Sequence, residues 1–163
     1  MAIFERDQIE EDVLEDLLEE INELHEASQQ TLMDLELHPE DVELQRSLFR
    51  YVHTIKGDLG LVGFSPIILL VSHVEDLLDY LRNGKMHYTS TMSDLVLLTM
   101  DRVKIFVEDA ISNGSVSYDD VLFDQLVRQI KRINPENADE HERLLAGAVL
   151  LLDPSLDATQ DEP

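Results

Sequence analysis

The sequence predicts an all-α fold, an antiparallel four-helix bundle with one or two additional C-terminal helices. Apolar residues recur at spacings of three and four along most of the 163 residues, as they do on the buried face of an α-helix. Proline and glycine interrupt this pattern where one helix would turn back into the next. A chain of this length can bury roughly 70% of its unfolded surface, which is enough for one domain with a continuous core.

The first two predicted helices are the longest regular stretches. The first runs from about Asp7 to Leu37, and Pro39 marks its break. The second begins near Glu40 and ends in the region 60–63, which contains two glycines. Its predicted buried stripe consists of aliphatic residues at helical spacing: Leu44, Leu48, Val52, Ile55 and Leu59.

Two further helices complete the predicted bundle. Ser65 and Pro66 resemble an N-cap and first-turn pair for a third helix that ends near Asn83. A fourth helix is predicted from about Met92 to Ser112, where an Asn-Gly pair ends it. Four antiparallel helices of this size close a bundle, and we expect this core to cover about residues 7–113.

The remaining residues predict extra helices and a tail. Ser117-Tyr118-Asp119-Asp120 resembles a capping box before a helix that ends near Asn134. A second such box, at 137–140, precedes a helix to about Leu152. We therefore expect a single domain over residues 1–152, with extra helices at about 118–152. Residues 153–163 are polar and bounded by proline, which predicts a disordered tail or a linker.

Charge and composition exclude several classes of function. Acidic residues outnumber basic residues by 35 to 12, and a net charge of -23 repels nucleic acids and anionic membranes. Without cysteine, the chain has neither disulfides nor thiolate metal ligands. The histidines at positions 25, 38, 87 and 141 are not spaced as the ligands of a metal ion would be. The first residues lack an apolar signal core, and no apolar run is long enough to span a membrane. We therefore expect a cytoplasmic protein without a bound metal or cofactor.

The run His53-Thr54-Ile55-Lys56-Gly57 indicates chemistry rather than packing. A neutral imidazole is a competent nucleophile near neutral pH, and an ammonium group one helical turn away can stabilise a phosphoryl group. Gly57 and Gly60 leave the helix surface clear for a partner protein, although each costs about 1 kcal/mol relative to alanine. This spacing predicts a histidine that accepts a phosphoryl group.

The segment resembles the histidine phosphotransfer (HPt) family, and within it the phosphotransfer domain of CheA-type chemotaxis kinases. The matching segments are 48–50, 53–57, 60–64, 75–79 and 82–86. The resemblance implies an HPt-like bundle in which His53 is phosphorylated, Lys56 pairs with the phosphate and Glu75 holds the other ring nitrogen. Gly57, Gly60 and Ser72 would lie on the face that docks partner proteins.

One position departs from the family pattern. The family places a second histidine one turn before the glutamate, and this chain has Ser72 there. His73 is the next residue, but it lies about 200° around the helix from Glu75. We therefore do not expect His73 to replace the missing histidine.

The resemblance implies a phosphorelay intermediate that takes a phosphoryl group on His53 and passes it to a receiver-domain aspartate. Its partners would be a histidine kinase and a response regulator, and the Mg²⁺ used in transfer would belong to the receiver. The chain has no ATP-binding signature, so we do not expect it to be a kinase. Two alternatives stay open: a scaffold that is not phosphorylated, and a detached N-terminal module of a CheA-like kinase.

Overall fold

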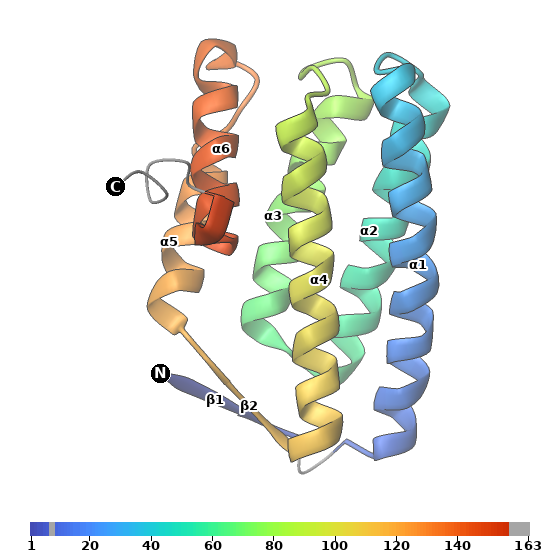
Figure 1. Cartoon of the computed structure of the whole chain (residues 1–163), viewed down its shortest axis with the longest axis vertical. Coiled ribbons are helices and arrows are strands. Elements are labelled where there is room, and N and C mark those ends of the chain that lie inside the picture. The colour runs from blue at the N-terminus through green and yellow to red at the C-terminus, as the bar shows by residue number, and fades with distance from the viewer. Residues whose placement is uncertain (7–8, 157–163) are drawn as a thin grey trace.

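The computed structural model describes residues 1–6 and 9–156, and these fold mainly into helices (Figure 1). Helices α1 (Glu11–Leu37), α2 (Val42–Val62), α3 (Ser65–Arg82) and α4 (Ser90–Asn113) form an antiparallel bundle. In this bundle α1 packs against α2 and α4, and α2 also packs against α3. The predicted all-α bundle is therefore confirmed, with two more helices after it.

The bundle helices begin and end for identifiable local reasons. The side chain of Asp41 caps α2 by accepting hydrogen bonds from the backbone N–H groups of residues 43 and 44. Gly63 ends α2 with a φ of 78°, a backbone conformation that favours glycine. Pro66 lies in the first turn of α3, as predicted, but Ser65 is already helical and does not act as the N-cap.

The first predicted helix starts too early in the sequence-based assignment. Helix α1 begins at Glu11 rather than near Asp7, and residues Ala2–Glu5, for which no element was predicted, form strand β1. Strand β1 pairs antiparallel with β2 (Ser115–Tyr118), so that Ala2 lies opposite Tyr118 and Glu5 opposite Ser115. Neither strand was predicted, because four residues are too few for a periodic signal and the partners are far apart in sequence.

Helices α5 (Asp120–Lys131) and α6 (His141–Leu152) form a second layer beside the bundle (Figure 1). They pack against each other, while α5 covers α3 and α6 covers α4. The predicted capping boxes are wrong in detail. Ser117 lies in β2, and Asp119 caps α5 by accepting from the N–H of Leu122. At the second predicted box, Asn137 makes no side-chain cap hydrogen bond, and a short 3-10 turn (Ala138–Glu140) precedes α6.

A second 3-10 turn, Pro154–Leu156, follows α6 in the segment predicted as a tail. The rest of that segment, residues 157–163, lies outside the described residues, as do residues 7–8 at the predicted start of the first helix. The assignment of residues 1–152 to one domain stays a prediction. Among the described residues, no helix combines the length and the apolar character needed to cross a membrane.

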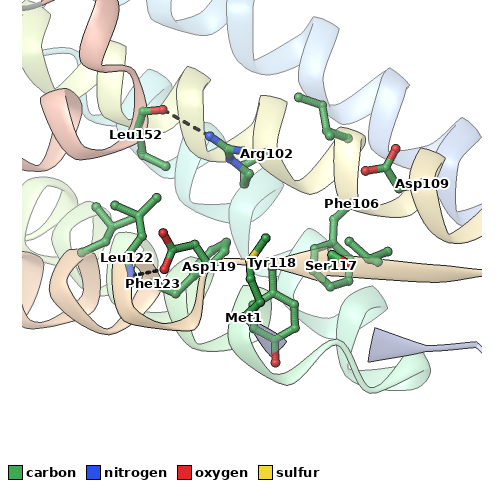
Figure 2. Close-up of a pocket in the computed structure, with 13 residues that line it drawn as sticks. Met1, Arg102, Phe106, Asp109, Ser117, Tyr118, Asp119, Leu122, Phe123 and Leu152 are labelled. Carbon is green, nitrogen blue, oxygen red and sulfur yellow. Dashed lines mark hydrogen bonds between the residues drawn. The ribbon is translucent and has the colours of Figure 1, made fainter. Parts of the chain in front are cut away.

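One continuous apolar core joins the bundle to the second layer. Near the β-ribbon the core is aromatic: the ring of Phe4 meets Phe64 edge-on at 4.2 Å between centroids and lies 5.7 Å from Phe106. Beside this cluster, α4, β2, α5 and the end of α6 line a cavity of about 160 Å³ (Figure 2). Arg102 donates there to the carbonyl of Leu152 and so ties the end of α6 to α4.

Candidate phosphotransfer site

Helix α2 presents His53 to solvent because its buried apolar residues point the other way. The buried residues of α2 include Leu48, Val52, Ile55, Leu59 and Val62, which share one face at helical spacing. His53 directly follows a buried valine, so it is rotated by about 100° from that valine's direction. Its side chain is 62% exposed.

Helix α3 brings a carboxylate to this imidazole. Glu75 lies on the face of α3 that meets α2, and its side chain is only 11% exposed. The Nδ1 atom of His53 lies 2.7 Å from Oε2 of Glu75. Because an ionised carboxylate can only accept hydrogen bonds, Nδ1 carries the proton and Nε2 carries the lone pair. The exposed imidazole therefore has its nucleophilic nitrogen on the side away from Glu75.

Lys56 binds the second oxygen of the same carboxylate. Its Nζ donates to Oε1 of Glu75 at 2.8 Å, and its side chain is 29% exposed. The two donors come from adjacent turns of α2, and together they neutralise and satisfy a carboxylate that would otherwise be costly to bury. The structure thus brings His53, Lys56 and Glu75 into one hydrogen-bonded group.

Two residues that were quoted for the resemblance but given no role also lie at this group. The ring of Phe49, one turn before His53, is nearly parallel to the imidazole, with centroids 5.8 Å apart and an angle of 12° between the planes. The guanidinium carbon of Arg82 lies 3.8 Å from the centroid of the Phe49 ring. The signal was available in the sequence, because residue 49 precedes residue 53 by one helical turn.

The residues predicted to dock partners lie on the two helices that form the imidazole group, α2 and α3. Gly57 and Gly60 are exposed, and an added Cβ atom at either position would meet no other atom within 4 Å. Ser72 is half-buried on α3, one turn before Glu75. His73 is turned elsewhere: its Nδ1 lies 3.5 Å from Asp76, in a hollow that Lys131 and Ile133 also line.

Within residues 1–6 and 9–156, no cluster of three or more His, Cys, Asp or Glu side chains is arranged to hold a metal ion. The groups that the chain itself provides at this site are an imidazole nitrogen, an ammonium group and a carboxylate. An exposed imidazole with a fixed tautomer, beside a cation, is the arrangement that a phosphoryl acceptor needs.

The comparisons with known proteins agree with this geometry. The family model described as the Hpt domain matches residues 12–106. The sensor histidine kinase CheAY of Helicobacter pylori is 30% identical over 131 residues, which are 79% of this chain and 16% of that protein. The chemotaxis protein CheA of Halobacterium salinarum is 32% identical over 109 residues, which are 67% of this chain and 16% of that protein.

Two solved structures are similar as well. The CheA phosphotransferase domain from Thermotoga maritima has a TM-score of 0.60 and 33% identity, and the match covers 63% of this chain and 97% of that domain. A solution structure of the histidine phosphotransfer domain of CheA has a TM-score of 0.61 and 31% identity, covering 74% and 92%.

Fold and site together define a histidine phosphotransfer module of a two-component system. The chain belongs to the Hpt domain family. It spans only 16% of the length of the two curated relatives described above.

Proposed function

We propose that Nε2 of His53 accepts a phosphoryl group and later passes it to an aspartate of a receiver domain. The observation that carries this proposal is the 2.7 Å contact between Nδ1 of His53 and Glu75, on an imidazole that is otherwise mostly exposed. This contact holds the proton on Nδ1 and leaves the Nε2 lone pair directed to solvent, where a phosphoryl donor can approach.

The transfer step follows from this tautomer. The Nε2 lone pair forms the N–P bond while the bond from phosphorus to the donor oxygen breaks, and that electron pair leaves with the donor. The proton on Nδ1 stays in place, so the phosphorylated ring carries a positive charge that the Glu75 carboxylate stabilises. In the onward step a carboxylate oxygen bonds to phosphorus while the N–P bond breaks, and its electron pair returns to Nε2. The cationic ring then leaves as a neutral imidazole, which favours this transfer.

Lys56 would provide the positive charge for the phosphoryl oxygens. In the unphosphorylated protein its ammonium group is bound to Glu75, one turn from His53. Its partly exposed, flexible side chain can turn from the carboxylate toward an incoming phosphoryl group, because the two acceptors compete for the same cation. Lys56 would thereby stabilise both the transition state and the loaded histidine.

The exposed face of α2 is proposed as the docking surface for the receiver and the kinase. Gly57 and Gly60 have no packing neighbours that require glycine, although each weakens the helix by about 1 kcal/mol. Their absence of side chains lets a second protein approach the imidazole. Charge supports the same choice: α1 carries ten acidic residues and no Lys or Arg, whereas Arg46 and Arg50 are exposed on α2. A receiver with acidic residues around its aspartate would meet Arg50 there, whereas Arg46 already pairs with Glu43.

His53→Gln tests the acceptor directly. The variant should lose all phosphorylation by potassium phosphoramidate, a small donor that needs no docking, while the protein stays folded with unchanged helicity, because the side chain is exposed and Lys56 still binds Glu75. Acid-labile, base-stable phosphate measured on the wild-type protein identifies phosphohistidine. His87→Gln, an exposed histidine outside the site, is the control and should remain labelled. Equal labelling of His53→Gln and wild type would refute the proposal.

Gly57→Leu tests the docking surface. The leucine side chain should block transfer to a receiver and leave phosphoramidate labelling of His53 intact, since a small donor needs little room. Gly57→Ala should raise the free energy of unfolding by about 0.5–1 kcal/mol. Ser112→Leu, at an exposed position of α4, is the matched control. A receiver that accepts phosphate from Gly57→Leu at the wild-type rate would show that docking uses another face.

The alternative of an unphosphorylated scaffold is not favoured, because a binding surface alone needs neither a fixed tautomer nor a cation beside it. The regions of the chain that match known proteins correspond to a phosphotransfer module. We therefore propose that a histidine kinase supplies the phosphoryl group in the cytoplasm. The flow of phosphate between kinase, His53 and receiver would then make this chain an intermediate in the relay.

A further inference from the structure

The imidazole of His53 has a second neighbour that bears on its orientation. Besides the hydrogen bond to Glu75, the ring lies nearly parallel to the ring of Phe49, at 5.8 Å between centroids and 12° between planes. This distance is within the range of favourable aromatic pairs. Both side chains come from α2, one turn apart, so the pairing is built into the helix itself.

The position of the Phe49 ring is in turn held by α3. The guanidinium carbon of Arg82 lies 3.8 Å from the centroid of that ring, a cation–π contact. Arg82 is itself fixed, because its Nε and Nη2 atoms both lie 2.8 Å from Oδ1 of Asp79. The side chain of Asn83 also donates to Oδ1 of Asp79, at 3.2 Å. A chain of contacts therefore runs from Asp79 through Arg82 and Phe49 to the imidazole.

The hydrogen bond to Glu75 alone does not define the plane of the imidazole. One Nδ1–H···O contact holds one atom of the ring and still permits the ring to turn about the line that joins the two atoms. His53 is 62% exposed, so the protein surface offers few other restraints. The orientation matters because the Nε2 lone pair lies in the ring plane and must point at phosphorus for in-line transfer.

We propose that Phe49, held by Arg82, is a positioning residue that sets the plane of the His53 imidazole for phosphoryl transfer. This inference rests on the proposed role of His53. Phe49 contacts neither phosphate nor donor, and it acts only through the ring that it stacks on. The simpler explanation is that Phe49 only fills space at the edge of the core, since it packs partly against buried residues. The two explanations differ in which substitutions they tolerate.

Phe49→Leu and Phe49→Tyr separate these explanations. Leucine keeps an apolar side chain but loses the ring face, whereas tyrosine keeps the ring. With potassium phosphoramidate as donor, we expect Phe49→Leu to accept phosphate roughly tenfold more slowly, since misplacement of a reacting group commonly costs one or two orders of magnitude. Phe49→Tyr should stay close to the wild-type rate. Tyr80→Leu, a half-buried aromatic on the α5 side of α3, is the matched control and should not change the rate.

Arg82→Gln tests the support of Phe49 and should slow acceptance severalfold in the same assay. Arg128→Gln is its control, because Arg128 forms a similar ion pair with Asp124 on α5, away from the site. When a receiver serves as the phosphoryl donor, the Phe49→Leu and Arg82→Gln variants should lower the maximal rate without changing the donor concentration at half-maximal rate. If the variants raised the donor concentration at half-maximal rate and left the maximal rate unchanged, these residues would have a docking role and the proposal would be overturned.

NMR of the unphosphorylated protein gives a readout that does not depend on phosphorylation. In wild type we expect NOEs between the ring protons of Phe49 and His53, and a downfield shift of the His53 ring protons in Phe49→Leu. If phosphoramidate fails to label wild-type His53, the proposed function fails, and the NMR result alone decides whether Phe49 orients the ring. If Phe49→Leu keeps the wild-type rate, or slows only with a loss of melting temperature that Phe49→Tyr shares, Phe49 is not a positioning residue.

Discussion

At the residue scale, Glu75 is the group on which the site depends. One buried carboxylate accepts from both His53 and Lys56, through different oxygens. Each contact has its own function. The contact with the imidazole sets the tautomer of His53, and the contact with the ammonium group holds a cation near the reacting nitrogen. Both functions require the negative charge as well as the shape of the side chain.

Glu75→Gln should therefore impair the site while keeping its shape. An amide can accept only through one atom and carries no charge, so we expect phosphoryl acceptance to slow by roughly 10²-fold. The free energy of unfolding should fall by about 1–2 kcal/mol, because hydrogen bonds to a charged group are lost at a buried position. Labelling kinetics with phosphoramidate and urea unfolding measure the two effects.

A second histidine–carboxylate pair in the chain offers a control. His25 Nε2 lies 2.8 Å from Asp101 Oδ1, between α1 and α4, and the His25 side chain is only 12% exposed. Asp101→Asn should lower stability less, because the Asp101 side chain is 52% exposed, and should leave the phosphorylation rate unchanged. If Glu75→Gln and Asp101→Asn gave equal labelling rates, the carboxylate of Glu75 would have no role in transfer.

At the scale of the element, α2 has two different interfaces. Its contact with α3 assembles the site, whereas its contact with α1 contains an unfavourable pair of carboxylates. A hydrogen bond with Asp58 raises the pKa of Glu20 on α1, and burial and the nearby Asp58 charge act in the same direction. The Oδ2 atom of Asp58 is buried and has no hydrogen-bond partner among the described residues.

Asp58→Asn should stabilise the α1–α2 interface at neutral pH. A carboxyl group whose pKa is raised by folding destabilises the folded state when it is ionised, and the penalty vanishes as the pH falls and the group takes up a proton. We expect the melting temperature at pH 7 to rise by about 1–2 °C, a small gain because Glu20 is exposed. Near pH 3 the difference should disappear. Glu19→Gln, which removes an exposed charge from the same turn of α1, is the control. A gain that is equal at both pH values would exclude charge repulsion as the cause.

At the scale of the whole molecule, the N-terminal strand ties the bundle to the second helical layer. Strand β1 pairs with β2, which leads into α5, while Phe4 of β1 reaches the aromatic cluster at the end of α2 and α4. The residues of this cluster are different from those that contact His53 on α2 and α3. Stability and phosphotransfer are therefore expected to depend on different parts of the molecule.

Phe4→Ala should separate the two properties. Removal of the ring should lower the free energy of unfolding by about 2–3 kcal/mol, since the side chain is partly buried against Phe64 and Phe106. The phosphorylation rate at temperatures where the variant is folded should remain that of wild type. Ile3→Ala on the same strand is the control, because Ile3 is 61% exposed and should cost less than about 0.5 kcal/mol. A slower rate in folded Phe4→Ala would show that the ribbon influences the site.

The four bundle helices could be predicted because each depends on local features: apolar spacing, Pro39, Gly63 and the Asn-Gly pair after α4. The β-ribbon could not, because its two strands are far apart in the sequence and each is only four residues long. The start of α1 was also wrong, because the helix begins at Glu11 rather than near Asp7. Within the site, His53 and Lys56 were predicted from their spacing, whereas Glu75 followed only from the resemblance to a family.

The sequence by itself determined which residues face solvent on α2, because a helix places residues 53, 56, 57 and 60 on one side whenever its apolar residues are buried on the other. It also determined the strongly acidic character of α1 and the basic residues of α2. Only the tertiary structure decided that Glu75 binds both His53 and Lys56, and that Arg82 lies against Phe49. The rotation and height at which α3 packs against α2 set these contacts, and they depend on the complementary shapes of two buried surfaces rather than on the spacing within either helix.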